Sequence, residues 1–277
     1  MQAPRLWVRL ARDRSAIVGL SIVTMLTLAA VAAPWLAPAD PLRGSLNESL
    51  QAPSASFWLG TDVQGRDILT RVLFGARLSL AVGLVSQSVA SLLGLVLGLL
   101  AGYYGRWVDG ALMRLADVTL AFPSLLLLIA IAAAVTPSLP LVFVVIGIVG
   151  WAGMARLVRG QVLALRGLDY VQAARALGAR DARILARHLL PGVLAPVMVA
   201  ATLGVGGAIM AEAALSFIGL GAQPPTPSWG AMVADGRDLL RVAPWVSLIP
   251  GLAIGLTVLG MNLLGDGLRD ALEVRTA

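Results

Sequence analysis

Six long apolar runs limit this chain to a protein that crosses a membrane several times. A helix needs about 20 mostly apolar residues to cross the hydrocarbon core of a bilayer, with a lower limit of about 17. Each of the six runs reaches that length. The sequence therefore predicts an all-α membrane protein with six transmembrane helices, at residues 16–37, 78–101, 118–135, 139–155, 193–220 and 243–264.

The charge content agrees with residence in a membrane. Only 13% of the residues are charged and the mean hydropathy is +0.85, whereas an ordinary soluble domain carries about 25% charged residues. The net charge of +6 is therefore not interpreted as nucleic-acid binding. Membrane lipid is expected around the chain, and no nucleic-acid partner is expected.

The first apolar run has features of a signal peptide, because four arginines precede it and the sequence "AVAAP" ends it. The apolar region of a signal peptide spans roughly 7–15 residues. This run spans about 22 residues, so we predict a first helix that is retained.

The distribution of arginine predicts the orientation. Fifteen of the 21 arginines fall on one side of the six predicted helices and six on the other. Because basic residues accumulate in cytoplasmic loops, both termini are predicted to be cytoplasmic. The expected organisation is a cytoplasmic segment, 1–15, and a single transmembrane domain, 16–277, with an outer loop at 38–77 and a cytoplasmic loop at 156–191.

The chain offers few groups for catalysis or for a metal ion. It has no cysteine and a single histidine, His188, which excludes thiolate sites and argues against a histidine-based metal cluster. It also has no lysine, which a nucleotide-binding P-loop requires. We therefore expect no catalytic residue, no metal site and no cofactor in this chain, and any ATP hydrolysis would belong to a partner.

The segment 169–191, "DYVQAARALGARDARILARHLLP", interrupts the apolar sequence with four arginines. Gly178 can end a first short helix at its C′ position, and a second helix is expected at 181–190. Pro191 is expected to separate that second helix from the next span. Four residues of the first helix share one face by their spacing of i, i+3, i+4 and i+7, namely Tyr170, Ala173, Ala174 and Leu177.

Two readings of this segment compete on physical grounds alone. It could be an ordinary basic loop that serves only the positive-inside rule. Orientation, however, requires only arginines, and it does not require an alanine-rich face, a helix stop and a proline at these spacings. The second reading is a surface that receives a partner.

The segment resembles the cytoplasmic EAA loop of ABC-transporter permeases. That loop reads Glu-Ala-Ala, three residues, Gly, nine residues, a hydrophobic residue, one residue and Leu-Pro. Here Gln172 stands in place of the glutamate and His188 at the hydrophobic position. The glutamine keeps a polar group and removes a charge, and His188 fits packing better than titration. In that family the first short helix is the coupling helix, which docks into a cleft of the ATPase subunit. The resemblance implies an ATPase-coupling site formed by Asp169, Tyr170, Gln172, Ala173, Ala174, Leu177, Gly178, Leu190 and Pro191.

Four other stretches narrow the resemblance: "LGTDVQGRDILTRVLFGARLSL", "DVTLAFPSLLLLIA", "EAALSFIGLGAQPPTPSWG" and "NLLGDGLRDAL". They look like the inner-membrane permeases of dipeptide, oligopeptide and nickel importers, and more closely like the C-type subunit (DppC/OppC-like). This implies a type I ABC importer permease fold in a bacterial or archaeal inner membrane. It also implies three kinds of partner: a second homologous permease, two ATPase subunits that bind ATP and Mg²⁺, and an extracytoplasmic solute-binding protein.

The resemblance favours short peptides as the solute and leaves nickel or another small solute as the alternative. Two other classes fit less well. An ion-coupled secondary transporter should show several buried acids or inverted repeats. An intramembrane enzyme should show a nucleophile and a base brought together.

Two polar residues within predicted spans are candidates for the transport pathway or its gate, since ionisable or polar groups inside a bilayer are costly. Glu212 is expected near the outer edge of the membrane, either solvated at the interface or at an outer gate. Asn262 is expected either to bond another helix or to line the pathway.

Further contacts are expected from local spacing. Asp62, Arg66 and Asp67 should form ion pairs within the outer loop or part of a docking surface for a binding protein. Arg114 and Asp117, three residues apart, should form an ion pair. Small-residue spacing along the second span predicts tight helix packing, through Gly83, Gly94, Gly98 and Gly102.

Overall fold

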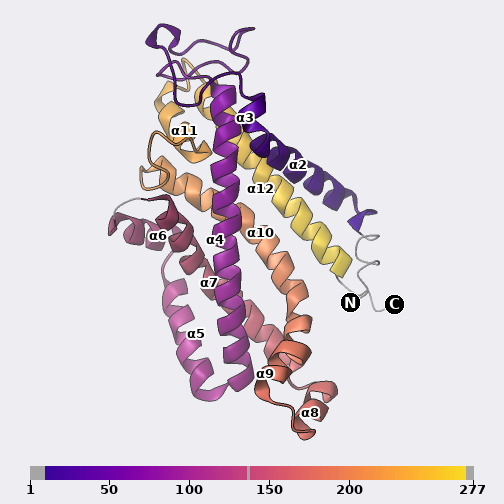
Figure 1. The fold of residues 1–277 in the computed structure, drawn as a ribbon. Coiled ribbons are helices and arrows are strands. Elements are labelled where there is room, and N and C mark those ends of the chain that lie inside the picture. Colours follow the sequence, from indigo (N-terminus) through magenta and orange to yellow (C-terminus); the bar gives the residue numbers. More distant parts are fainter. Residues whose placement is uncertain (1–9, 136–137, 273–277) are drawn as a thin grey trace.

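The computed structural model describes residues 10–135 and 138–272, and the described chain folds as an elongated helical bundle without strands (Figure 1). Residues 38–67 and α11 lie at one end of the bundle, called here the α11 end. The short helix α8 lies at the opposite end, the α8 end. The helices are α2 (Arg14–Val31), α3 (Ala33–Leu36), α4 (Ile68–Tyr104), α5 (Arg106–Ala121), α6 (Ser124–Ala133), α7 (Leu139–Leu165), α8 (Asp169–Ala176), α9 (Asp181–Ile184), α10 (Leu190–Phe217), α11 (Trp229–Gly236) and α12 (Trp245–Leu272), with 3₁₀ turns at Leu46–Glu48 and Arg237–Leu239.

Five helices in the described part of the chain are long and apolar enough to cross a membrane: α2, α4, α7, α12, and α9 together with α10. The third predicted span, 118–135, is wrong as a single straight helix. The chain bends by 88° between α5 and α6. Phe122 has an extended backbone there, with φ −92° and ψ 140°, because the ring of Pro123 disfavours helical dihedrals in the preceding residue. The bent pair can be counted as a sixth span.

Several helices extend beyond their apolar runs. α4 begins at Ile68 and not at residue 78, and α12 continues to Leu272. Hydropathy marks the part of a helix that suits hydrocarbon, whereas backbone hydrogen bonding continues into water. At about 1.5 Å per residue, the 37-residue α4 is roughly 55 Å long, which exceeds the hydrocarbon thickness of about 30 Å.

The predicted close packing at glycines is confirmed, and the neighbours belong to the same chain. A Cβ atom at Gly94 would lie 2.5 Å from Met154 of α7, and one at Gly98 would lie 2.6 Å from the carbonyl oxygen of Ala155. At Gly83 the neighbour is Ile209 of α10. These glycines let the backbone of α4 come into close contact with α7 and α10.

Other elements complete the bundle. α2 packs against α12, and the start of α2 lies beside the end of α12 (Figure 1).

The predicted ion pair between Arg114 and Asp117 is wrong, because Asp117 pairs with Arg156 of α7. A second ion pair joins the same helices, with Arg159 Nη2 2.6 Å from Asp109 Oδ2. The two pairs fasten α5 to α7.

Candidate functional site

Residues 169–191 are called here the candidate coupling loop. Its first helix, α8, ends where the sequence predicts. Gly178 has φ +76°, a conformation that glycine adopts without strain. The N–H groups of Gly178 and Ala179 donate to the carbonyl oxygens of Arg175 and Ala174, at 3.0 and 3.1 Å. This is the Schellman pattern of helix termination. Gly178 therefore fixes both the end of α8 and the direction in which the chain continues.

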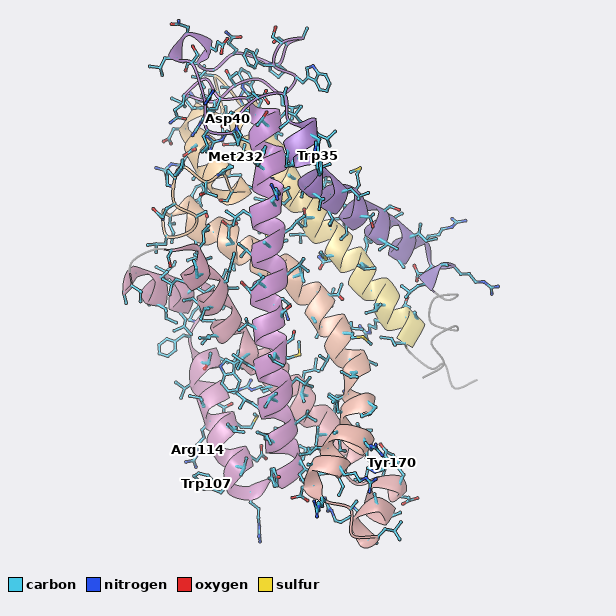
Figure 2. All side chains as sticks on the ribbon, viewed as in Figure 1. Trp35, Asp40, Trp107, Arg114, Tyr170 and Met232 are labelled. Carbon is cyan, nitrogen blue, oxygen red and sulfur yellow. The ribbon has the colours of Figure 1, made fainter. Side chains whose placement is uncertain are left out.

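The predicted face of α8 lies largely at the surface. Leu177 is 88% exposed and Tyr170 47% exposed, whereas Ala173 is exposed and Ala174 half-buried. Tyr170 lies at the α8 end, far from Trp35 and Met232 near the α11 end (Figure 2). Tyr170 of α8 and Leu177, the C-cap residue that follows it, thus leave two apolar side chains exposed at this end of the bundle.

Sequence reasoning missed the residue that anchors α8. Val171 is fully buried and belongs to an apolar cluster with Ile184, Leu189 and Val193 of the following helices, and with Val162 of α7. Its only signal in the sequence is that it is the one branched aliphatic residue of α8. Burial of Val171 leaves the opposite face outward.

Polar contacts hold the loop to the ends of α4 and α7. The side-chain amide of Gln172 donates to the carbonyl oxygen of Arg166 at 3.1 Å, and Arg166 Nη1 donates to the carbonyl oxygen of Gly102 at 2.9 Å. The Tyr103 hydroxyl donates to Asp181 at 2.7 Å, and the guanidinium of Arg175 lies 5.5 Å from the centre of the Tyr103 ring.

The two residues that depart from the EAA pattern have distinct surroundings. Gln172 acts as a donor at the end of α7, a role that an ionised glutamate cannot fill because it only accepts. His188 is half-buried, with its ring 6.4 Å from that of Tyr170. Its carbonyl oxygen accepts from the Tyr170 hydroxyl at 3.4 Å, a long hydrogen bond. Both observations place His188 in packing contact with α8.

The expected break at Pro191 is wrong. Residues Asp181–Phe217 form one helix, in which a π-helical turn at Leu185–Leu189 directly precedes α10. The N–H of Leu190 donates to the carbonyl oxygen of Leu185, five residues earlier. A proline ring clashes with the carbonyl four residues before it, and the wider π turn provides the local adjustment. The candidate coupling loop is thus continuous with the membrane helix α10.

Glu212 does not lie at a solvated interface, as one of its two readings expected. It is 1% exposed, and its Oε1 accepts from the Ser216 hydroxyl at 2.6 Å. Ser216 in turn accepts from the N–H of Ala222 at 3.2 Å and lies 3.4 Å from the Ser228 hydroxyl. Among the described residues Glu212 Oε2 has no hydrogen-bond partner. Glu212 therefore helps to fasten residues 219–228 onto α10.

The second pathway candidate, Asn262, is exposed on α12. A further polar residue, Gln87, was missed. It lies near the middle of α4, where its amide donates to Ser91 at 3.0 Å, and a Cβ at Gly204 of α10 would lie 2.2 Å from Gln87 Oε1. Its sequence signal is that it is the only amide in the predicted second span.

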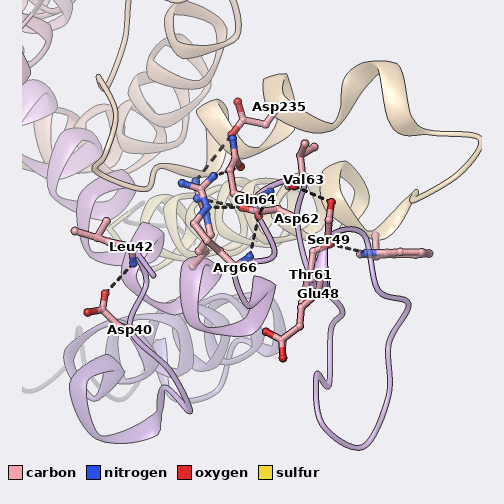
Figure 3. Close-up of polar contacts among 12 residues, drawn as sticks. Asp40, Leu42, Glu48, Ser49, Thr61, Asp62, Val63, Gln64, Arg66 and Asp235 are labelled. Carbon is pink, nitrogen blue, oxygen red and sulfur yellow. Dashed lines mark hydrogen bonds and ion pairs between the residues drawn. The ribbon is translucent and has the colours of Figure 1, made fainter. Parts of the chain in front are cut away.

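The expected ion pair between Asp62 and Arg66 is confirmed, and Arg71 and Asp235 join it in place of Asp67 (Figure 3). Asp62 Oδ2 accepts from Arg66 Nε at 2.7 Å, and Arg71 Nη1 lies 3.1 Å from the same oxygen, without hydrogen-bond geometry. Arg71 also reaches Asp235 of α11 at 3.9 Å. Burial raises the pKa of Asp235 despite the nearby Arg66. Asp67 instead caps α4, accepting from the N–H of Thr70 at 2.7 Å.

The comparison with known proteins decides the family. Residues 94–277 match the family described as the inner membrane component of binding-protein-dependent transport systems. The chain belongs to this permease family. Residues 4–53 match the N-terminal transmembrane domain of oligopeptide transport permease C. The permease is therefore a multi-pass inner membrane protein.

Curated relatives match the permease over nearly its whole length. The dipeptide transport system permease protein DppC of Alkalihalophilus pseudofirmus is 49% identical, over 96% of this chain and 87% of the relative. The glutathione transport system permease protein GsiD of Pectobacterium atrosepticum is 46% identical, over 96% and 89%.

A solved structure shows the same fold. A chain of the methionine ABC transporter MetNI, in an inward-facing conformation, superposes with a TM-score of 0.59 and 19% sequence identity. The match covers 73% of the permease and 97% of that chain. The predicted type I importer permease fold is thereby confirmed.

Proposed function

We propose that this permease carries short peptides into the cell as one subunit of an ATP-driven importer. The relatives that match it over most of its length are named as dipeptide and glutathione permeases, and both solutes are small peptides. In the proposed assembly a second homologous permease completes the pathway. An extracytoplasmic binding protein delivers the solute, and two ATPase subunits bind ATP and Mg²⁺.

The observation that carries the ATPase contact is the exposed face of α8. Leu177 and Tyr170 project from a helix whose other side is anchored by the buried Val171. A short helix that is firmly seated and apolar on its free side can receive force from a partner without unfolding. In this proposal the α8 end and both termini are cytoplasmic, which agrees with the arginine distribution.

Movement of α8 would reach the membrane through the helix Asp181–Phe217. ATP-driven closure of the two ATPases would displace α8, and the continuous helix would carry the displacement to the region of Glu212 at the α11 end. The bundle would then pass between two packed states, since packed helices do not deform continuously.

A matched pair of variants tests the ATPase contact. Ala173→Glu places a carboxylate on the exposed face of α8, and Ala182→Glu places the same group on an exposed alanine of α9. With the importer subunits co-expressed, Ala173→Glu should abolish co-purification of the ATPases and Ala182→Glu should retain it. Equal co-purification with both variants would refute the assignment of α8.

The solute is tested on the binding protein that works with this permease. Titration calorimetry should show binding of a dipeptide or of glutathione, and no binding of Ni²⁺ alone. Binding of Ni²⁺ without binding of either peptide would replace the peptide proposal by the nickel alternative.

A further inference from the structure

One side chain of α4, that of Tyr103, contacts both α8 and α9, the two halves of the candidate coupling loop. The hydroxyl of Tyr103 donates to the carboxylate of Asp181, the first residue of α9, at 2.7 Å. The ring of the same tyrosine lies 5.5 Å from the guanidinium carbon of Arg175, in the last turn of α8. Tyr103 therefore joins two segments that Gly178 separates.

The surroundings hold Tyr103 in this position. It is 8% exposed and packs in the apolar cluster that contains Val171, Ile184 and Leu189. The neighbouring residue, Gly102, accepts a hydrogen bond from Arg166 at the end of α7. A tyrosine hydroxyl that is bonded to a carboxylate forms a charge-assisted and directional link.

The other end of α4 also has polar contacts, with α11. The side chain of Trp229, at the start of α11, donates to the carbonyl oxygen of Val72 at 3.0 Å, and its backbone N–H lies 3.4 Å from the Ser79 hydroxyl. Trp229 is fully buried. Between Val72 and Tyr103 the helix is unbroken.

We propose that Tyr103 is a positioning residue that couples movement of the loop to α4 as well as to α10. α4 then carries displacement of α8 and α9 along its length to Trp229 and the α11 end. This second route rests on the proposed function, in which the loop receives force from an ATPase. It links both halves of the loop to one side chain, α9 through the hydroxyl and α8 through the ring.

The substitution Tyr103→Phe isolates that hydroxyl, because phenylalanine keeps the ring, the apolar packing and the contact with Arg175. In the complete importer, reconstituted in lipid vesicles with its binding protein, we measure peptide uptake per ATP hydrolysed. Tyr103→Phe should lower this ratio clearly below that of the unaltered importer, because it removes the hydrogen bond between α4 and α9. Co-purification of the ATPases and hydrolysis without binding protein should stay unchanged.

Three further variants make the test specific. Tyr104→Phe removes the adjacent hydroxyl, which is not part of this link, and should leave the ratio unchanged. Asp181→Ala should reproduce the defect, and adding Tyr103→Phe to it should lower the ratio no further, because both remove the same bond. Asp181→Asn keeps an accepting oxygen and should retain most of the ratio.

The possible failures are distinguishable. If Tyr103→Phe takes up as much peptide per ATP as the unaltered importer, the inference is overturned. This holds even if the variant melts at a lower temperature. If the unaltered permease does not co-purify with the ATPases, the proposed function itself is wrong.

Discussion

The side-chain amide of Gln172 donates to the carbonyl oxygen of Arg166 at 3.1 Å, across the turn from α7 into α8. The relation explains why an amide is useful at a position where the EAA pattern has glutamate. The bond satisfies one of the carbonyl groups that the end of α7 leaves unpaired.

Gln172→Glu should loosen α8, because an ionised glutamate cannot donate to that carbonyl. The loss of one hydrogen bond, about 1 kcal/mol, should speed hydrogen exchange of the α8 amides by about five-fold. Gln172→Ala should have a similar effect, since it also removes the donor. Slower exchange in the glutamate variant than in the native chain would contradict this account.

Gly178→Ala should destabilise the loop through the backbone alone. Nothing lies within 4 Å of a Cβ built at Gly178, but its φ of +76° is unfavourable for alanine by about 1 kcal/mol. Gly167→Ala is the matched control, because its Cβ also meets open space and its φ lies outside the positive range. Hydrogen exchange of residues 169–184 should accelerate in the first variant only. Equal exchange in the two variants would show that backbone strain at Gly178 is unimportant.

Glu212→Ala should lower the unfolding free energy by about 2 kcal/mol, since it leaves a cavity and removes the acceptor of the Ser216 hydroxyl. Met210→Ala, at a half-exposed position of the same helix, should have a much smaller effect. Thermal unfolding in detergent measures both. If the two variants have the same melting temperature, the contacts of Glu212 do not stabilise the α11 end.

Arg71→Met should destabilise the outer loop strongly, because it leaves the buried Asp62 with one cation where it had two. Breaking a buried ion pair costs about 3–5 kcal/mol. Arg43→Met removes an exposed pair with Asp40 and should cost less than about 1 kcal/mol. Limited proteolysis within residues 38–67 should increase for Arg71→Met alone. Comparable cleavage of the two variants would argue against a structural role for Arg71.

The sequence predicts best those features that one residue determines locally. Gly178 ends α8 because its backbone conformation suits glycine, and the small residues of α4 allow close helix contacts. The bend at Pro123 is also encoded locally, but an average over the apolar run conceals it. Hydropathy counts side chains and does not register the loss of helical dihedrals at Phe122.

Features that depend on distant segments escaped sequence reasoning. Val171 is buried because it packs in a cluster with residues of α4, α7 and the helix that begins at α9. The polar contacts around Glu212 depend on the return of Ala222 and Ser228 to Ser216 of α10. The helix through Pro191 depends on a π turn that no spacing in the sequence predicts.

The most direct test of the coupling account uses the absence of cysteine from this chain. Leu177→Cys supplies a single thiol on the exposed face of α8, and Trp58→Cys supplies one at the α11 end, at a position that is 72% exposed. A thiol-reactive photo-crosslinker attached to each variant in the assembled importer should join Leu177→Cys, and not Trp58→Cys, to an ATPase subunit. An ATPase adduct at residue 58, or none at residue 177, would contradict the account.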